Sequence, residues 1–184
     1  MDNLKHIALK GQGYFCIVNL YEDEKTGKRY ALKKLRKEHY SSDEYRYRLS
    51  REIELLKQLQ GCENIIKLID SSHNESTQEL WYLMPYAHCN LYDYIKNNNA
   101  ILTIELRFQI IDQIIIAIKY AHSKSILHRD ISPTNVLVFE HDGKPNIKVC
   151  DFGFGKNKES LSFYTKSSAS GYVRTMYCSK VGTK

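Results

Sequence analysis

The sequence predicts an α+β protein with two unequal lobes, a small antiparallel sheet with one helix followed by a mainly helical region. Residues 1–84 contain short β-branched and aromatic runs separated by glycine-containing or polar turns. Pro85 then interrupts the strand pattern, because it has no N–H to donate to a central strand. Residues 104–118 carry apolar side chains at helical spacing. We therefore expect a first lobe over residues 1–84, an interruption over 85–90 and a second, mainly helical lobe within 91–184.

The composition is that of an ordinary single-domain globular protein. The chain has 184 residues, 42% of them hydrophobic and 26% charged. Its net charge of +6 is scattered without a long basic block, so no nucleic-acid partner is expected. The five cysteines lack metal-ligand spacing, which predicts reduced thiols in an intracellular protein, cytoplasmic or nuclear. The amino-terminal residues are too polar for a signal peptide and no apolar run is long enough to span a membrane, so no membrane association is expected.

The first two predicted strands lie within residues 5–21 and are joined by a turn that contains Gly11 and Gly13. Glycines allow backbone N–H groups to approach phosphates closely. A plain hairpin turn is the alternative, and it is the more common meaning of such a pair. The pair therefore identifies a phosphate-binding loop only in combination with other residues.

The third strand and the first helix are expected to share a buried ion pair. Residues 29–35 alternate as a strand, which places Ala31 and Lys33 on one face. A helix is expected over about 42–59, and Glu52 falls within its apolar stripe. A carboxylate in such a position is costly unless it is paired, so we expect it to bind Lys33. The alternative is a glutamate at the helix rim whose carboxylate reaches solvent.

Two further strands are expected at residues 65–70 and 79–84, with a polar loop between them. A helix should begin at about Leu91. Thr103 is the expected N-cap of a long helix that ends near His122. Its apolar stripe is too broad for a surface helix, so we expect it to form the buried core of the second lobe.

Polar residues suited to phosphate chemistry follow this helix. Asp130 and Asn135 lie five positions apart on a proline-containing loop, and the strand at 147–150 leads Asp151 into a glycine turn. Carboxylate and amide oxygens are the ligands that Mg²⁺ prefers, which would leave Asp130 to orient a nucleophile. The alternative is that these short Asp, Asn and Pro clusters only make turns.

Taken together, the segments His128-Arg129-Asp130 to Asn135 and Asp151-Phe152-Gly153 resemble the catalytic and metal-binding loops of serine/threonine protein kinases. The glycine pair resembles the glycine-rich loop of that family, with Cys16 in place of its third glycine. The resemblance covers nearly all of this chain but only about two thirds of a kinase domain. It implies a bilobal kinase fold with an incomplete C-terminal lobe, either a truncated domain or a fragment, which binds ATP and Mg²⁺ and has a hinge at residues 85–90. With that lobe incomplete, the apolar stripe on residues 104–118 would lack part of its partner surface, which predicts aggregation, partner binding or marginal stability.

The resemblance also implies a role for each site residue. Asp130 would orient the hydroxyl of a protein substrate, Lys33 aligned by Glu52 would contact the nucleotide phosphates, and Asn135 and Asp151 would hold Mg²⁺. Leu56, His128 and Phe152 would stack into a hydrophobic spine. The positions implied to bind ATP are Gly11, Gly13, Val18, Ala31, Lys33, Met84, Pro85, Ala87 and Leu137.

Two departures from the family limit the inference of activity, the truncation of the second lobe, which is the larger, and Ser132. Ser132 stands where serine/threonine kinases carry a lysine, and losing that charge would cost about 2–4 kcal/mol of transition-state stabilisation. Two hypotheses follow: a serine/threonine protein kinase, and a catalytically weak ATP-binding module that acts through partner binding. A small-molecule kinase is a third hypothesis, disfavoured because the serine-rich segment and Thr175 suit peptide substrates better.

Regulation is also implied by the resemblance. Arg129 before Asp130 is typical of kinases that are controlled by phosphorylation of the activation loop, which implies a regulatory or activating partner. The candidate acceptors are Ser160, Ser162, Thr165, Ser167, Ser168 and Ser170.

Overall fold

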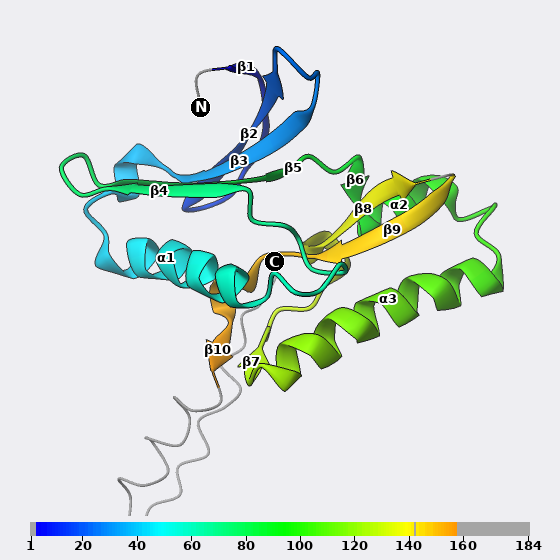
Figure 1. Cartoon of the computed structure of the whole chain (residues 1–184). Coiled ribbons are helices and arrows are strands. Elements are labelled where there is room, and N and C mark those ends of the chain that lie inside the picture. The colour runs from blue at the N-terminus through cyan, green and yellow to red at the C-terminus, as the bar shows by residue number, and fades with distance from the viewer. Residues whose placement is uncertain (1–2, 142, 158–184) are drawn as a thin grey trace, which may run out of the picture.

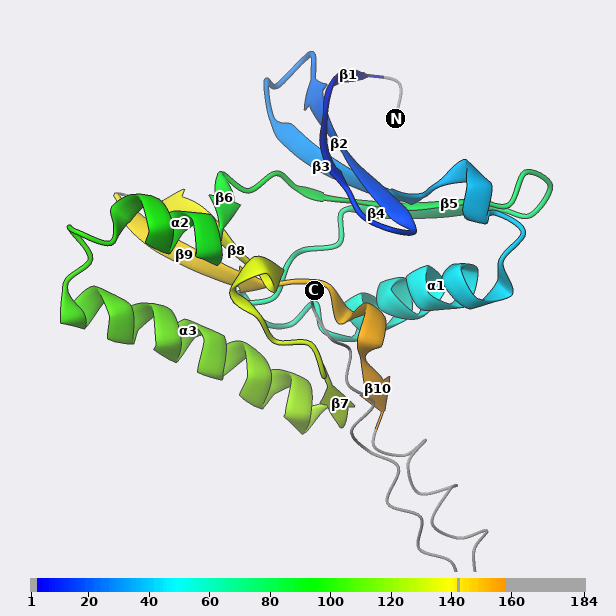
Figure 2. The same cartoon turned by 180° about the vertical axis from the view of Figure 1, so that it is seen from behind.

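The computed structural model describes residues 3–141 and 143–157 and shows an α+β architecture (Figures 1 and 2). A five-stranded sheet and one helix form the first lobe, and the second lobe contains two helices and two small sheets. The predicted antiparallel sheet with a single helix is therefore confirmed. The elements of the first lobe are β1 (Leu4–Gln12), β2 (Cys16–Asp23), β3 (Arg29–Leu35), α1 (Asp43–Gln58), β4 (Asp70–Asn74) and β5 (Glu79–Pro85).

The five strands are ordered β1-β2-β3-β5-β4, and every neighbouring pair is antiparallel. This order places β3 in the middle of the sheet, between β2 and β5. β5 runs through Pro85, one residue beyond its predicted end, and Pro85 lies opposite Tyr30 in the last pair of the ladder. A proline is tolerated there because the ladder ends at this residue.

The strand predicted at residues 65–70 is wrong, because β4 lies at Asp70–Asn74 in the segment expected to be a polar loop. Ile65 and Ile66 are buried, but their backbone pairs with Val149 of the second lobe. The Ile66 N–H donates to the Val149 carbonyl at 2.9 Å. The apolar run is therefore a connection between lobes, and the polar residues of β4 suit an exposed edge strand.

Helix α1 begins where the sequence predicts. The Ser42 hydroxyl accepts a hydrogen bond from the Tyr45 N–H at 3.5 Å, at the long end of the range for an N-cap. Leu49, Ile53, Leu55 and Leu56 of this helix are buried, together with Glu52. The helix lies along the sheet in both views of the fold (Figures 1 and 2).

The second lobe is built around α3 and a three-stranded sheet. Its elements are β6 (Cys89–Asn90), α2 (Leu91–Asn98), α3 (Ile104–Ser123), β7 (Ile126–Leu127), β8 (Val136–His141), β9 (Lys144–Val149) and β10 (Lys156–Asn157). One sheet has the order β6-β8-β9, and β7 pairs with β10. Within residues 3–141 and 143–157, none of the helices combines the length and the apolar character needed to cross a membrane.

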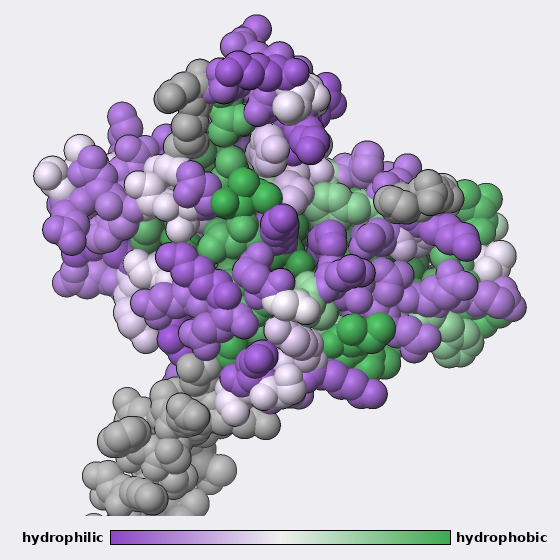
Figure 3. All heavy atoms as spheres, viewed as in Figure 1, coloured by the Kyte–Doolittle hydropathy of each residue, from purple (hydrophilic) through white to green (hydrophobic). Residues whose placement is uncertain are grey.

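The prediction that the broad stripe of α3 is buried is wrong for most of its large side chains. Only Ile110, Ala117 and Ala121 of this helix are buried, whereas Phe108 is 59% exposed and Ile115 is 42% exposed. The helix packs through one narrow side, against β9 and β7. The described part of the chain places no element over the opposite side, and hydrophobic residues reach the surface over α3 (Figure 3).

Candidate nucleotide and catalytic site

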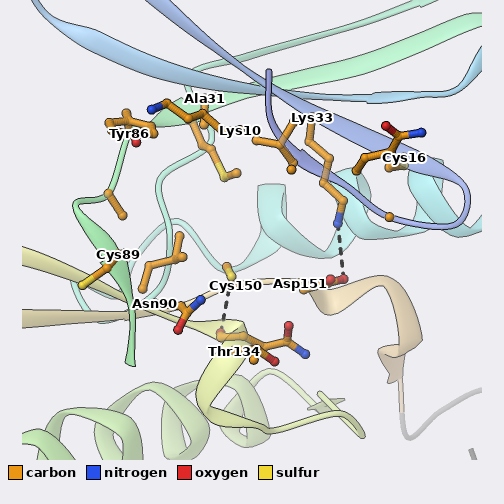
Figure 4. A pocket seen from close by; sticks show the side chains of 18 of the residues that line it. Lys10, Cys16, Ala31, Lys33, Tyr86, Cys89, Asn90, Thr134, Cys150 and Asp151 are labelled. Carbon is orange, nitrogen blue, oxygen red and sulfur yellow. Dashed lines mark hydrogen bonds and ion pairs between the residues drawn. The ribbon is translucent and has the colours of Figure 1, made fainter. Parts of the chain in front are cut away.

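A cavity of about 690 Å³ lies between the two lobes (Figure 4). Its lining comes from β1, β2 and the loop between them, and from the strands β3 and β5 of the same sheet. The connector after Pro85, the start of α2, the strand β8 with the two residues before it, and the two residues after β9 complete the lining. Eleven of the predicted site residues line it: Gly11, Gly13, Val18, Ala31, Lys33, Met84, Pro85, Ala87, Asn135, Leu137 and Asp151. The remaining two, Glu52 and Asp130, are not part of the lining.

The predicted ion pair between Lys33 and Glu52 is present. The Lys33 ammonium lies 3.1 and 2.9 Å from the two carboxylate oxygens of Glu52, which is fully buried on α1. The Tyr82 hydroxyl donates a hydrogen bond to the same carboxylate at 2.8 Å. Because Tyr82 lies directly opposite Lys33 in the ladder of β3 and β5, both side chains leave the sheet on the same face.

The charges of this pair follow from burial and mutual attraction. Burial disfavours the protonated amine of Lys33, but the carboxylates of Glu52 and Asp151 outweigh it and raise the pKa of Lys33 well above its usual value. Burial also raises the pKa of Glu52, and the charge of Lys33 opposes that shift. Since both oxygens of Glu52 accept from the Lys33 ammonium, the carboxylate is ionised in this arrangement.

Asp151 extends the ion pair into the cavity. Its carboxylate lies 3.3 Å from the Lys33 ammonium, the contact drawn in Figure 4. Although burial disfavours its charged form, the attraction of Lys33 and the Gly153 N–H lower the pKa of Asp151 below its usual value. The residue itself has φ of 62°, in the left-handed region, two residues after the end of the extended strand β9. Lys33 thus joins the helix α1 to the loop that follows β9.

Asp130 and Asn135 form a second pair on the loop before β8. The Asn135 amide N–H₂ donates to the backbone carbonyl of Asp130 at 2.9 Å and to its carboxylate at 3.0 Å. The Asn135 carbonyl in turn accepts from the Cys150 N–H at 2.9 Å. These contacts hold Asp130 beside Asn135, which lines the cavity, and connect its loop to the residue before Asp151.

His128 connects the loop that carries Asp130 to the loop that carries Asp151 through backbone hydrogen bonds. It is buried, its Nε2–H donates to the Cys150 carbonyl at 2.8 Å, and its Nδ1 accepts from the Asp130 N–H at 3.2 Å. This pattern requires the neutral ring, and burial lowers the pKa of His128. Its ring centroid lies 4.5 Å from that of Phe152, with the two ring planes tilted by 57°, and both Phe152 and Leu56 belong to the buried hydrophobic cluster.

Cys16, in place of the third glycine, behaves as an apolar side chain. It is 6% exposed, and burial raises the pKa of its thiol to about 12. A thiol in that state is protonated at neutral pH and is a poor nucleophile. Cys16 therefore fills the wall of the cavity without adding chemistry to it (Figure 4).

Several lining residues escaped the sequence prediction. Tyr82 could have been found, because pairing β3 with β5 places it opposite Lys33. Lys10 could not, because its contact with the Tyr86 ring, 5.6 Å from ammonium to centroid, joins β1 to the connector and depends on the closed fold. Outside the lining, the guanidinium Nε–H of Arg129 donates to the Phe154 carbonyl at 2.5 Å, a contact that likewise depends on the closed fold.

The residues present fit a magnesium ion bound together with nucleotide phosphates. Asp151 and Asn135 both line the cavity and supply carboxylate and amide oxygens, the hard ligands that this ion prefers. Among residues 3–141 and 143–157, no cluster of three or more Asp, Glu, His or Cys side chains could hold a metal ion. Phosphate oxygens and water would therefore have to complete the ligand set, as is usual for Mg²⁺ at nucleotide sites.

The comparisons with known proteins agree with this site. The family model described as "Protein kinase domain" matches residues 4–177. The chain is 34% identical over 170 residues to the carbon catabolite-derepressing protein kinase of Candida glabrata, covering 92% of this chain and 27% of that protein. It is 33% identical to the protein of the same name from Saccharomyces cerevisiae, covering 92% of this chain and 26% of that protein. With calcium-dependent protein kinase 4 of Plasmodium falciparum, identity is 34% over 162 residues, 86% of this chain and 30% of that protein.

The chain therefore belongs to the protein kinase family. It spans about a quarter of the length of the carbon catabolite-derepressing kinases that it matches. The predicted acceptors at residues 160–170, and Thr175, lie outside the described residues.

Proposed function

We propose that this chain transfers the γ-phosphate of ATP to serine or threonine hydroxyls of proteins. The observation that carries the proposal is Lys33, which contacts Glu52 at 2.9 Å and Asp151 at 3.3 Å inside the cavity. A protonated lysine in this position can bind phosphate oxygens while its own side chain is held by Glu52. Phosphoryl transfer needs mainly positioning and charge neutralisation, which such a constellation supplies.

The other residues have complementary roles in this proposal. Val18, Ala31 and Leu137 would enclose the adenine ring, with the Pro85 carbonyl and the Ala87 N–H available to its polar edge. Gly11 and Gly13 would let the loop between β1 and β2 approach the phosphates, and Met84 lines the same cavity. A bound Mg²⁺ would neutralise the phosphate charge.

Asp130 would act on the protein substrate. Its carboxylate accepts from the Asn135 amide at 3.0 Å, which fixes its direction, and it is exposed beside Asn135, where a peptide hydroxyl can reach it. Asp130 would orient the hydroxyl and accept its proton as the oxygen forms its bond to phosphorus and the bond to the β-phosphate breaks. Asn135 and Asp151 would hold the metal ion. The unpaired thiols of Cys16, Cys62, Cys89 and Cys150 support the cytoplasmic or nuclear location proposed with this activity.

A catalytically weak ATP-binding module that acts by binding a partner is the second candidate. It is favoured by Ser132, whose hydroxyl hydrogen-bonds that of Thr134 at 2.8 Å and supplies no charge to the transferred phosphate. If this charge is what the site lacks, Ser132→Lys should raise the transfer rate by roughly 10²- to 10³-fold.

The test is transfer of radiolabelled phosphate from ATP to a basic protein, with Mg²⁺, beside binding of a fluorescent ATP analogue. We expect transfer by the unmodified chain, its loss in Asp151→Ala, and its retention in Asp112→Ala, which removes an exposed carboxylate of α3. Nucleotide binding without transfer, in both the unmodified chain and Ser132→Lys, would favour the binding module instead.

A further inference from the structure

The loop between β1 and β2 is held at its backbone by cationic and aromatic side chains from outside the cavity. The Arg36 guanidinium donates to the Gly13 carbonyl at 3.2 Å and to the Tyr14 carbonyl at 3.3 Å, and the Arg36 N–H donates to the Phe15 carbonyl at 2.9 Å. His39 donates from Nε2 to the Tyr14 carbonyl at 3.0 Å. Three consecutive carbonyls of the loop therefore accept from only two residues.

This arrangement sets the direction of the loop amides. In a trans peptide the C=O and the N–H point in opposite directions. With the carbonyls of Gly13 and Tyr14 turned toward Arg36, the N–H groups of Tyr14 and Phe15 are directed away from that cation. Carbonyl oxygens that repel phosphate are thereby occupied, which suits a loop that covers an anionic ligand.

The side chains of the same loop contact α1. The rings of Phe15 and Tyr45 are stacked, with centroids 5.5 Å apart and an interplanar angle of 7°. Tyr14 lies edge-on to Tyr45 at 5.7 Å and stacks on His39 at 5.3 Å, and His39 lies 4.7 Å from Tyr45. Tyr45 is thus in contact with all three other rings, although Tyr14 itself is 72% exposed.

Tyr45 and Glu52 are seven residues apart on α1, which is two helical turns. Both therefore lie on nearly the same side of the helix. One side of α1 consequently contacts the cavity wall at two points, the glycine-containing loop through Tyr45 and Lys33 through Glu52.

We propose that Tyr45, with His39 and Arg36, is a positioning residue that holds the loop over the nucleotide phosphates. The inference rests on the nucleotide binding of the proposed function and names the residues that fix the loop. Because Tyr45 contacts the loop separately from the ion pair of Lys33 and Glu52, its loss should weaken nucleotide binding even with that pair intact.

The test is the affinity of the chain for a fluorescent ATP analogue, measured with Tyr45→Ala, Tyr45→Phe and His39→Ala. We expect Tyr45→Ala and His39→Ala to weaken binding about 3- to 10-fold, and Tyr45→Phe to retain it because the ring contacts remain. Tyr47→Ala is the matched control, since this tyrosine of the same helix is 69% exposed and should leave affinity unchanged.

Where transfer is measurable, Tyr45→Ala should raise KM for ATP and leave KM for the protein substrate unchanged, a split that general destabilisation would not produce. Equal affinity of Tyr45→Ala, His39→Ala and the unmodified chain would overturn the positioning role of Tyr45 and His39 while leaving the proposed function intact. Failure of the unmodified chain to bind the analogue would instead overturn the proposed function, and the positioning role with it. His39→Ala keeps the test decisive if Tyr45→Ala does not fold.

Discussion

The number of side chains buried by helices α1 and α3 is the reverse of what their compositions suggest. Helix α1 is rich in charged residues, yet it buries five side chains, one of them the carboxylate of Glu52. Helix α3 is rich in isoleucine, yet it buries only Ile110 and two alanines. The difference lies in what packs against each: α1 contacts the sheet and the turn after Asp151, whereas the described residues cover only one side of α3. An apolar stripe therefore predicts the capacity for burial, and burial itself depends on a neighbouring element.

The largest expected effect tests the buried charge of α1. Glu52→Ala should lower the free energy of unfolding by about 3–5 kcal/mol, because it leaves the Lys33 ammonium and the Tyr82 hydroxyl buried without their shared partner. Urea denaturation measures this loss. Glu54→Ala is the matched control, since its side chain is 62% exposed and pairs only with Arg51 at 3.3 Å, and it should change stability by less than about 0.5 kcal/mol. Similar losses in both variants would contradict the comparison.

The second prediction compares apolar side chains directly. Leu56→Ala in α1 removes a fully buried side chain and should cost about 2–5 kcal/mol. Ile115→Ala in α3 removes a side chain that is 42% exposed and should cost less than about 1 kcal/mol, because alanine also has the higher helix propensity. Thermal and urea unfolding of the two variants provide the measurement. A loss at Ile115 as large as that at Leu56 would mean that α3 is packed on both sides in solution.

The smallest expected effect is a dependence of the free energy of unfolding on pH, caused by His128. This buried residue follows the largely exposed helix α3 in the chain. Because the folded pKa of His128 lies below its unfolded value of about 6.5, the unfolded state binds more protons as the pH falls below that value. The stabilising contribution of neutral His128 should therefore be fully present above pH 6.5. Below that pH the free energy of unfolding should fall, by up to about 1.4 kcal/mol per pH unit until the folded pKa is reached.

Unfolding in urea at several pH values, with His128→Gln as the comparison, measures this contribution. The glutamine variant keeps a side-chain donor for the Cys150 carbonyl but does not titrate, so its stability should depend less on pH in this window. Parallel pH profiles for the two proteins would show that His128 is not the source.

Much of the fold followed from local patterns in the sequence. Thr103 was predicted as the N-cap of α3 and is its N-cap in the structure, because capping depends on residues adjacent in the chain. The helical spacing of apolar residues placed α1 at about 42–59, and it is observed at Asp43–Gln58. The pair of Lys33 and Glu52 followed from strand alternation and helical spacing, which are equally local. These signals were sufficient for the elements that hold the cavity.

The errors came from interactions between distant segments. Ile65 and Ile66 have the composition of a strand, but their backbone partner is Val149, more than eighty residues later. The exposure of Phe108 likewise depends on what covers α3, which no property of the helix itself reveals. The ring contacts of Tyr45 also escaped prediction, since they join three separate segments.

The left-handed backbone at Arg129 and Asp151 carries a cost in free energy. Their φ angles are 67° and 62°, a conformation that costs a residue with a side chain about 1–2 kcal/mol. Glycine at either position would remove that backbone cost. It would also remove the Asp151 carboxylate that lies 3.3 Å from the buried Lys33 ammonium, and the Arg129 guanidinium that donates to the Phe154 carbonyl. The strained backbone at each position is therefore opposed by a contact of its own side chain, so a glycine variant of either residue would gain backbone freedom and lose a link between segments.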